Sequence, residues 1–303
     1  MTPVAKKPPG PLIAITIEPK AKADQETLDV SLKEIVREDP SFRVHSERGR
    51  GQTILEGMGE LHSESVVDRL LCEFKIETNV GKPQVAYKET VCETVEHEAK
   101  FVRQVGGRGQ YGHVVLRVEP LPPRKGFEFA DSTKGGVVPP KYVLAVEKGV
   151  RAATEAGMLV GYPFVDVKVT LLDGSYHEVD SSEIAFKIVG SIAFKEAARR
   201  ASPVILEPVM SVEVVVPGEF LGDVIGNLSA RRGKILGIDD SRANVWAIHA
   251  HVPLAQMLGY AADLHARTQG RATSTMEFET YVQADPPLDP DGNEPASMAL
   301  RVA

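Results

Sequence analysis

The order of predicted secondary structure is repeated in this chain, and the repeat limits the possible folds more than any other feature. Residues 12–81 predict strand, helix, two strands, helix and strand, because apolar residues alternate, then recur three and four apart, then alternate again. Residues 203–283 predict the same six elements in the same order. This β-α-β-β-α-β order is typical of the ferredoxin-like arrangement. We therefore expect an α+β protein in which two ferredoxin-like modules flank a distinct middle segment.

Spacing separates strand from helix clearly in the first module. Ile13, Ile15 and Ile17 alternate within residues 12–19 and so share one face of a strand. Asp24 is a suitable N-cap for the helix that follows. The apolar residues of that helix are Leu28, Leu32, Ile35 and Val36. The change of period within one short segment is what predicts an α+β unit.

The middle segment, residues 82–202, predicts strands and two helices. One helix starts at Pro140, and the second follows the polar residues 173–183. Asp180 and Glu183 have the spacing of a capping box at the start of the second helix. The residues expected to face inward are Val143, Val146, Val150 and Ala153 in the first helix and Ile184, Ile188, Ile192 and Phe194 in the second.

Composition excludes several classes of protein. The chain has 303 residues, of which 43% are hydrophobic and 25% charged, and no apolar run is long enough to span a membrane. The net charge of −7 argues against nucleic-acid binding by the whole surface, although local basic surfaces remain possible. Cys72 and Cys92 lack metal-ligand spacing; Cys72 is expected in the core and Cys92 on the surface. No signal peptide is recognised, so we expect a cytoplasmic protein.

The segment VGGRGQYGH, residues 105–113, contains the spacing G-x-G-x-x-G at Gly107, Gly109 and Gly112. A dinucleotide-binding fingerprint needs a strand before the glycines and a helix after them. Here residues 97–105 and 113–120 both alternate as strands. The glycines are therefore expected at the end of a β-hairpin rather than in a nucleotide site.

Other polar residues are weaker candidates for functional sites. Residues 173–183 contain serine, histidine and aspartate, but neighbours in one short turn rarely form a catalytic triad. His177 precedes a helix N-terminus, where an anion such as an RNA phosphate is favoured. His249 and His251 share a strand face without a third metal ligand at suitable spacing. The sequence contains no P-loop motif.

Several long segments resemble, in order, the three C-terminal domains of bacterial elongation factor G. They include IEPKAKADQETL (17–28), GQTILEGMGELH (51–62), NVGKPQVAYKET (79–90), RQVGGRGQYGHV (103–114), DGSYHEVDSSEIAFK (173–187), VILEPVMSVEV (204–214), GDVIGNLSARRGKILG (222–237) and VPLAQMLGYAADLHARTQGRA (252–272). The resemblance covers about residues 12–283.

The resemblance implies domain three at residues 12–81, an elongated domain four at 82–202 and domain five at 203–283. Residues 1–11 would be a linker or cut end, and residues 284–303 a disordered tail. The implied partner is the bacterial ribosome, through ribosomal RNA and the tRNA–mRNA duplex. The tip of domain four would contact RNA through Gly106, Gly107, Arg108, Gly109, Gln110, Tyr111, Gly112, His177, Asp180, Ser181 and Ser182. Contacts with large-subunit RNA would come from Arg231, Arg232, Lys234, Arg267 and Arg271.

The family's GTPase domain and the β-barrel after it have no counterpart in this sequence. The chain is thus expected to be no enzyme itself and to hold no cofactor, because GTP and magnesium would belong to the GTPase domain. We expect a monomer that contacts no membrane and has that GTPase domain as a further partner. A paralogue specialised for ribosome recycling or ribosome protection is an alternative within the family. A hydrolase that uses the region of His177 is the alternative outside it.

Overall fold

The computed structural model describes residues 10–21, 24–47, 52–105, 108–242 and 244–284. These residues form two compact units, each of which is described by itself. The first unit contains the described residues up to Ala86 together with Glu207–Thr280. The second contains Tyr87–Leu206 and the described residues from Tyr281 onward. In the described ranges no helix combines the length and the apolar character needed to cross a membrane.

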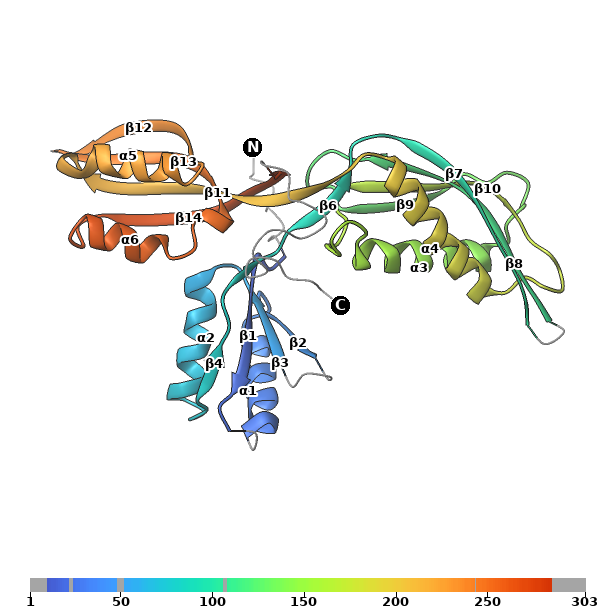
Figure 1. Cartoon of the computed structure of the whole chain (residues 1–303), viewed down its shortest axis with the longest axis horizontal. Helices are drawn as coiled ribbons and strands as arrows, with labels where there is room; N and C mark the ends of the chain where they lie inside the picture. Colours follow the sequence, from blue (N-terminus) through green and yellow to red (C-terminus); the bar gives the residue numbers. More distant parts are fainter. Residues whose placement is uncertain (1–9, 22–23, 48–51, 106–107, 243, 285–303) are drawn as a thin grey trace. The chain divides into compact units, whose positions relative to one another are not determined.

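The first sheet is ferredoxin-like, as the sequence predicts. Its elements are β1 (Ile13–Pro19), α1 (Gln25–Glu38), β2 (Arg43–Glu47), β3 (Gln52–Gly57), α2 (Glu60–Cys72) and β4 (Thr78–Val80). The strand order is β2-β3-β1-β4, with the short β5 (Gln84–Val85) paired to β1 (Figure 1). The buried core includes Ile15, Ile17, Leu28, Leu32 and Ile35, so the predicted faces of the strand and the helix are confirmed. Cys72 is exposed, which contradicts its predicted place in the core.

The C-terminal sheet repeats this topology. It comprises β11 (Pro203–Pro217), α5 (Leu221–Ala230), β12 (Lys234–Arg242), β13 (Val245–Pro253), α6 (Tyr260–Arg267) and β14 (Thr273–Gln283). Its order, β12-β13-β11-β14, is the order of the first sheet with equivalent strands in equivalent places. Helix α6 begins directly after Gly259, which has a left-handed φ of 70°. The predicted fold class, with two ferredoxin-like modules, is confirmed.

The middle segment forms a four-stranded sheet with two helices. Strands β7 (Val95–Val105), β8 (Arg108–Pro120), β9 (Phe127–Asp131) and β10 (Val167–Ser175) lie in the order β7-β8-β10-β9. β7 and β8 form the predicted hairpin, with Val105 opposite Arg108. Helices α3 (Pro140–Ala156) and α4 (Glu183–Arg200) pack together on one side of the sheet (Figure 1).

Helix α4 is turned differently from its predicted orientation. Ile184 is 66% exposed and Ile192 is 41% exposed, so the prediction that they face inward is wrong. The buried face instead consists of Ala185, Phe186, Val189, Gly190, Ala193, Phe194, Ala197 and Ala198. Gly190 is part of this face because α3 lies so close: a Cβ on Gly190 would lie 2.9 Å from the Val146 carbonyl oxygen, and a Cβ on Gly149 of α3 would lie 2.0 Å from the Lys187 carbonyl oxygen. The close packing of α3 and α4, rather than the hydrophobicity of the isoleucines, therefore determines which face of α4 is buried.

The start of α4 also differs from the predicted capping box. Ser182 is the N-cap, with a φ of −141°, and its side chain accepts a hydrogen bond from the Ala185 amide at 3.2 Å. Asp180 is therefore not the cap, and Glu183 is the first helical residue. Asp180 interacts with His177 instead.

Glu89, in the short strand β6 (Lys88–Val91), is a buried carboxylate that organises the middle domain. Its two oxygens accept hydrogen bonds from the five consecutive backbone amides of residues 158–162, at 2.8–3.2 Å. Residues 158–162 wrap around the carboxylate, and β10 begins only at Val167.

Candidate nucleic-acid interface

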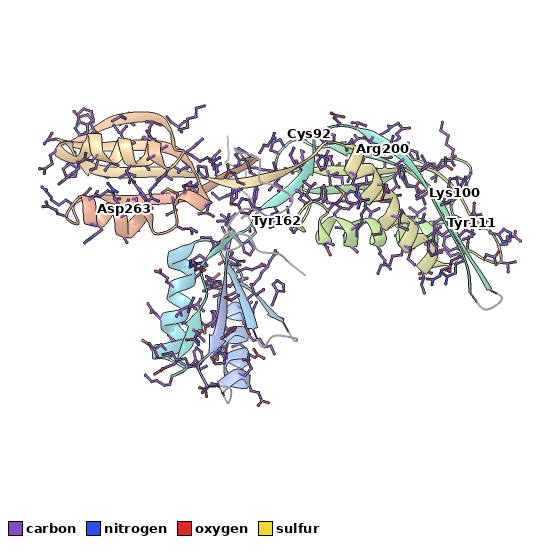
Figure 2. All side chains as sticks on the ribbon, viewed as in Figure 1. Cys92, Lys100, Tyr111, Tyr162, Arg200 and Asp263 are labelled. Carbon is purple, nitrogen blue, oxygen red and sulfur yellow. The ribbon has the colours of Figure 1, made fainter. Side chains whose placement is uncertain are left out.

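The end of the β7–β8 hairpin lies beside the turn of residues 176–182 that connects β10 to α4. The Tyr111 amide donates a hydrogen bond to the Asp180 carbonyl at 2.9 Å. The Ser181 hydroxyl donates to the Tyr111 carbonyl at 3.0 Å, and the two residues form a parallel bridge. Figure 2 shows Tyr111 near the end of this hairpin. The structure thus brings together two segments that are about 65 residues apart in the sequence.

Ser181 holds the turn in one conformation. Its hydroxyl oxygen accepts a hydrogen bond from the His177 amide at 2.8 Å, and its own amide donates to the His177 carbonyl at 3.0 Å. The Tyr142 hydroxyl of α3 donates to the Ser181 carbonyl at 3.1 Å. These bonds fix the backbone of the turn, so the residues that it presents are ordered before any ligand binds.

His177 is the polar side chain that this turn presents to solvent. Its side chain is 60% exposed, and Nδ1 lies 3.4 Å from an Asp180 carboxylate oxygen. The imidazole ring is 6.4 Å from the ring of Tyr111. The exposed Tyr176 and Val179 flank it. An exposed imidazole beside a carboxylate can donate a hydrogen bond to a phosphate oxygen or to a base edge.

Two glycines of the hairpin have close neighbours within the protein. A Cβ on Gly109 would lie 2.6 Å from the Asp180 carboxyl group, and a Cβ on Gly112 would lie 3.1 Å from Val189 and 3.2 Å from the Ala185 carbonyl oxygen. Because they carry no side chain, Gly109 lets the turn approach the hairpin closely and Gly112 lets helix α4 do so. Gly106, Gly107 and the side chain of Arg108 lie outside the described residues, while Gln110 is half-buried opposite Arg103.

The Tyr111 side chain is held by residues whose proximity the sequence does not predict. Its hydroxyl is 2.8 Å from Ser175 Oγ, which is also 2.8 Å from His113 Nδ1. His113 Nε2 is 3.0 Å from Glu98, whose pKa is lowered mainly by Lys100 and then by His113. These contacts follow from strand register, because β8 and β10 place His113 directly opposite Ser175. No pattern within either strand alone indicates this pairing.

The basic residues of the last module have carboxylate partners in that module. Arg231 binds Asp263 at 3.0 Å as well as the Gln256 carbonyl, and Arg267 binds the other Asp263 oxygen at 2.8 Å. Together they lower the pKa of Asp263, with Arg267 the larger cause. Arg231 also lies over the ring of the buried Tyr260, whose pKa burial raises to about 12.

The remaining members of this set are Arg232, Arg271 and Lys234. Arg232 forms two hydrogen bonds with the buried Glu207, at 2.7 and 3.2 Å, and Arg271 pairs with Glu219. Lys234, at the start of β12, is exposed. Three of the five predicted RNA-contacting residues of this module, Arg231, Arg232 and Arg271, therefore also link separate elements of it, and Arg267 pairs within α6.

The two histidines of the last module lie on β13, as predicted. His249 Nε2 is 3.2 Å from an Asp239 carboxylate oxygen of the neighbouring strand β12. Within the ranges that the structure describes, histidine, cysteine, aspartate and glutamate side chains form no group of three that could hold a metal ion.

Three family models match consecutive parts of the chain. The model described as elongation factor G, domain III, matches residues 8–82; that described as elongation factor G, domain IV, matches residues 83–202; and that described as elongation factor G C-terminus matches residues 204–290. A crystal structure of a protein from Thermus thermophilus is 38% identical, with a TM-score of 0.72. The match covers 92% of this chain but 42% of that one, so the chain spans less than half the length of this relative.

Three such matches in this order, on two ferredoxin-like modules and the domain between them, define part of a translation factor. The chain belongs to the elongation factor G family and comprises its domains III and IV and its C-terminal domain. The recognised domains do not include the family's GTPase domain.

Proposed function

We propose that this chain is the ribosome-binding part of an elongation factor G that promotes movement of tRNA and mRNA, with GTP hydrolysis supplied by another domain. The observation that carries the proposal is the position of His177: its side chain is exposed, while hydrogen bonds through Ser181 and Tyr111 fix its backbone. A group held in this way loses little conformational freedom on binding RNA. Arg108 on the adjacent strand adds a cation for the phosphate backbone.

The proposed tip comprises the hairpin residues 106–112 together with His177, Asp180, Ser181 and Ser182. The residues have different tasks in this proposal. His177 and Arg108 contact the tRNA–mRNA duplex, Tyr111 supplies a ring, and Ser181 and Ser182 hold the turn and the start of α4. A tip of this kind can bias movement only as far as it binds two ribosomal states with different affinity.

The second proposed contact is between the last module and large-subunit RNA, through Arg231, Arg232, Lys234, Arg267 and Arg271. Lys234 is exposed and supplies a direct phosphate contact. The arginines keep their carboxylate partners and present their remaining N–H groups, since a guanidinium has five donors. The GTPase domain, with GTP and magnesium, is the further partner, and the factor acts as a cytoplasmic monomer without membrane contact.

The first test is binding of this chain to vacant bacterial ribosomes across a salt series. We expect saturable binding that weakens steeply with salt, and weaker binding by an Arg108→Ala/His177→Ala variant, with a slope against log salt that is smaller by about 1. Arg117→Ala is the matched control, because Arg117 lies on the same hairpin but is paired with Glu96. Equal binding by the tip variant and the wild type would remove the tip from the interface.

A second test separates movement from hydrolysis in the full-length parent protein. His177→Ala is expected to slow movement of tRNA and mRNA and to leave ribosome-stimulated GTP hydrolysis largely unchanged, because the tip belongs to a different domain from the GTPase. Equal loss of both activities would contradict the proposed role. Full activity in ribosome recycling with none in translocation would favour the specialised paralogue, and His177-dependent esterase activity would favour a hydrolase.

A further inference from the structure

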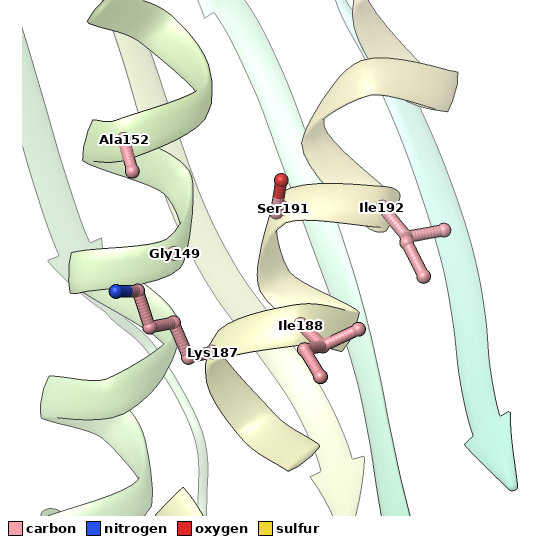
Figure 3. Close-up of a pocket in the computed structure, with 6 residues that line it drawn as sticks. All are labelled: Gly149, Ala152, Lys187, Ile188, Ser191 and Ile192. Carbon is pink, nitrogen blue, oxygen red and sulfur yellow. The ribbon is translucent and has the colours of Figure 1, made fainter. Parts of the chain in front are cut away.

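The face of the middle sheet opposite α3 and α4 carries a connected row of polar side chains. Figure 3 shows the two helices lying over the strands of this sheet. Gly112 and Val114 of β8 face the helices, because a Cβ on Gly112 would lie 3.1 Å from Val189 and Val114 belongs to the buried core. Alternate residues of a strand point to opposite faces, so Tyr111 and His113 lie on the other face.

Three contacts connect these side chains across the strands. Tyr111 Oη is 2.8 Å from Ser175 Oγ, and Ser175 Oγ is 2.8 Å from His113 Nδ1. His113 Nε2 is buried and lies 3.0 Å from a Glu98 carboxylate oxygen, although the two are not aligned as in a full hydrogen bond. This polar row therefore runs from Tyr111, beside the proposed tip, through β10 to a carboxylate on β7.

The carboxylate determines the direction of the hydrogen bonds in this row. An unprotonated Nε2 would point its lone pair at the negative charge of Glu98, so the proton of the neutral imidazole lies on Nε2. Nδ1 then accepts, and the Ser175 hydroxyl donates to it. Because a serine hydroxyl has only one proton, Ser175 accepts from Tyr111. The proton of the Tyr111 hydroxyl thus points to Ser175, and its oxygen lone pair points away from it.

Protonation of His113 reverses these hydrogen bonds. Both ring nitrogens of an imidazolium are donors, so Nδ1 donates to Ser175, and the Ser175 hydroxyl rotates to donate to Tyr111. The Tyr111 proton then points away from Ser175. Toward a ligand, the Tyr111 hydroxyl is therefore an acceptor while His113 is neutral and a donor once His113 is charged.

Charged and titratable groups near this row come from every element beside it: Glu98 and Lys100 from β7, Asp173 from β10, and His177 and Asp180 from the turn of residues 176–182. Lys100 lies opposite His113 in the strand register and 2.9 Å from Glu98, and it is the main cause that lowers the pKa of this carboxyl. Glu98 therefore stays ionised while His113 titrates. Nε2 keeps its proton in both charge states, and the reversal occurs at Nδ1.

We propose that His113 and Ser175 set the hydrogen-bonding direction of the Tyr111 hydroxyl at the proposed tip. With His113 neutral, Tyr111 accepts a hydrogen bond from an N–H or O–H donor of RNA, such as a base amino group or a ribose 2′-hydroxyl, and disfavours a phosphate oxygen, which only accepts. His113 and Ser175 are positioning residues, since they act through Tyr111. This inference rests on the proposed function, because its ligand is the RNA that the tip contacts.

The first test is NMR of the chain without ribosomes, with ¹³C at tyrosine Cζ and ¹⁵N in histidine. The neutral ring of His113 is expected to be the Nε2–H tautomer. The Tyr111 resonance should shift with pH at the same midpoint as His113, because its oxygen changes from donor to acceptor toward Ser175. Ser175→Ala should abolish this shift, and Ser175→Thr should retain it. Tyr142 is the internal control, because its hydroxyl donates to the Ser181 carbonyl.

Two NMR results would overturn the proposal. A neutral His113 ring with its proton on Nδ1 would mean that the hydrogen bonds run in another direction. A Tyr111 shift of equal size in Ser175→Ala and in the wild type would mean that the charge of His113 acts through space and not through the serine.

The second test is binding to vacant bacterial ribosomes at one pH above and one pH below the measured midpoint of His113. The dissociation constant of Tyr111→Phe is divided by that of the wild type, so that the ribosome's own pH dependence cancels. This ratio is expected to be about five above the midpoint and about one below it, because one hydrogen bond is lost only in the first case. With Ser175→Ala in both proteins, the ratio should be the same at both pH values.

The binding outcomes separate this inference from the proposed function. A ratio of about five at both pH values would contradict control by His113. A ratio of about one at both, together with weaker binding by Arg108→Ala/His177→Ala, would remove the Tyr111 hydroxyl from the interface and leave the proposed function intact. Equal binding by the wild type and all of these variants would reject the proposed tip, and with it RNA as the ligand of Tyr111.

Discussion

At the scale of single residues, Glu89 is a buried side chain that connects β6 to the backbone of residues 158–162. Its carboxylate accepts hydrogen bonds from five backbone amides, and a glutamine would place its own N–H groups against some of those donors. Glu89→Gln should therefore destabilise the protein by about 3 kcal/mol, measured by urea denaturation. Glu93→Gln is the matched control, since the exposed Glu93 accepts a bond from Ser202, and should cost less than about 0.5 kcal/mol. Equal effects would show that the amide cradle contributes little.

Gly109 is a residue whose substitution tests the organisation of the tip. The Cβ of Gly109→Ala would lie 2.6 Å from the Asp180 carboxyl group, so the Asp180 side chain must shift, which disturbs its contact with His177 and the turn that carries both residues. We expect hydrogen exchange of the Tyr111 and Ser181 amides to accelerate at least tenfold, with the stability of the whole chain nearly unchanged. Gly59→Ala, where the added Cβ has open space, should leave both amides as protected as in the wild type. Unchanged exchange in Gly109→Ala would mean that the turn is not held by this contact.

At the scale of elements, Asp39 connects the two helices of the first module. It follows α1, its carboxylate accepts hydrogen bonds from the Ser41 hydroxyl and amide, and it lies 3.0 Å from His62 of α2. Bonds from Ser41, and then His62, lower the pKa of Asp39 below its ordinary value of 3.8. Because the folded-state pKa is the lower one, this stabilisation is present above about pH 4 and is lost as pH falls through the folded-state pKa.

The corresponding prediction concerns acid unfolding of the first module. In Asp39→Asn, stability should depend less on pH between about 4 and 2 than in the wild type, because one titrating group is removed. Thermal unfolding followed across this range measures the difference. Asp29→Asn, on α1, controls for the loss of one acidic charge. A parallel pH dependence in Asp39→Asn and the wild type would contradict the assignment.

Elements also show where sequence patterns are sufficient and where they fail. The alternation of Ile13, Ile15 and Ile17 predicted a buried strand face correctly, because one sheet face packs on helices and the other does not. The isoleucines of α4 were wrongly placed inward, because α4 turns Gly190 toward α3, where an added Cβ would lie 2.9 Å from the Val146 carbonyl oxygen. The cap of α4 was misplaced for a similar reason: Asp180 interacts with His177 across a turn whose shape no local pattern gives. The proximity of Tyr111 and Ser181 could not be predicted from the sequence, because it follows from the pairing of strands that are distant in the sequence.

At the scale of the whole molecule, the two compact units should respond separately to substitutions. Glu89 belongs to one unit and Asp39 to the other. Hydrogen exchange followed by mass spectrometry should therefore show faster exchange for Glu89→Gln within residues 87–206 and little change within residues 13–80. Asp39→Asn at low pH should show the reverse. Changes of equal size in both units from either substitution would indicate one cooperative unit.

The pairing of β6 with β11 has a consequence for biosynthesis. Lys88–Val91 pairs with Pro203–Leu206, so the first strand of the middle domain finds its partner more than a hundred residues later. The amides that cradle Glu89 are themselves about seventy residues downstream. Such non-local contacts form late, because a long loop must close before they contribute. During synthesis, β6 and the Glu89 carboxylate therefore have no partners until the residues downstream have been made. The middle domain can complete its fold only after the first strand of the last module has left the exit tunnel.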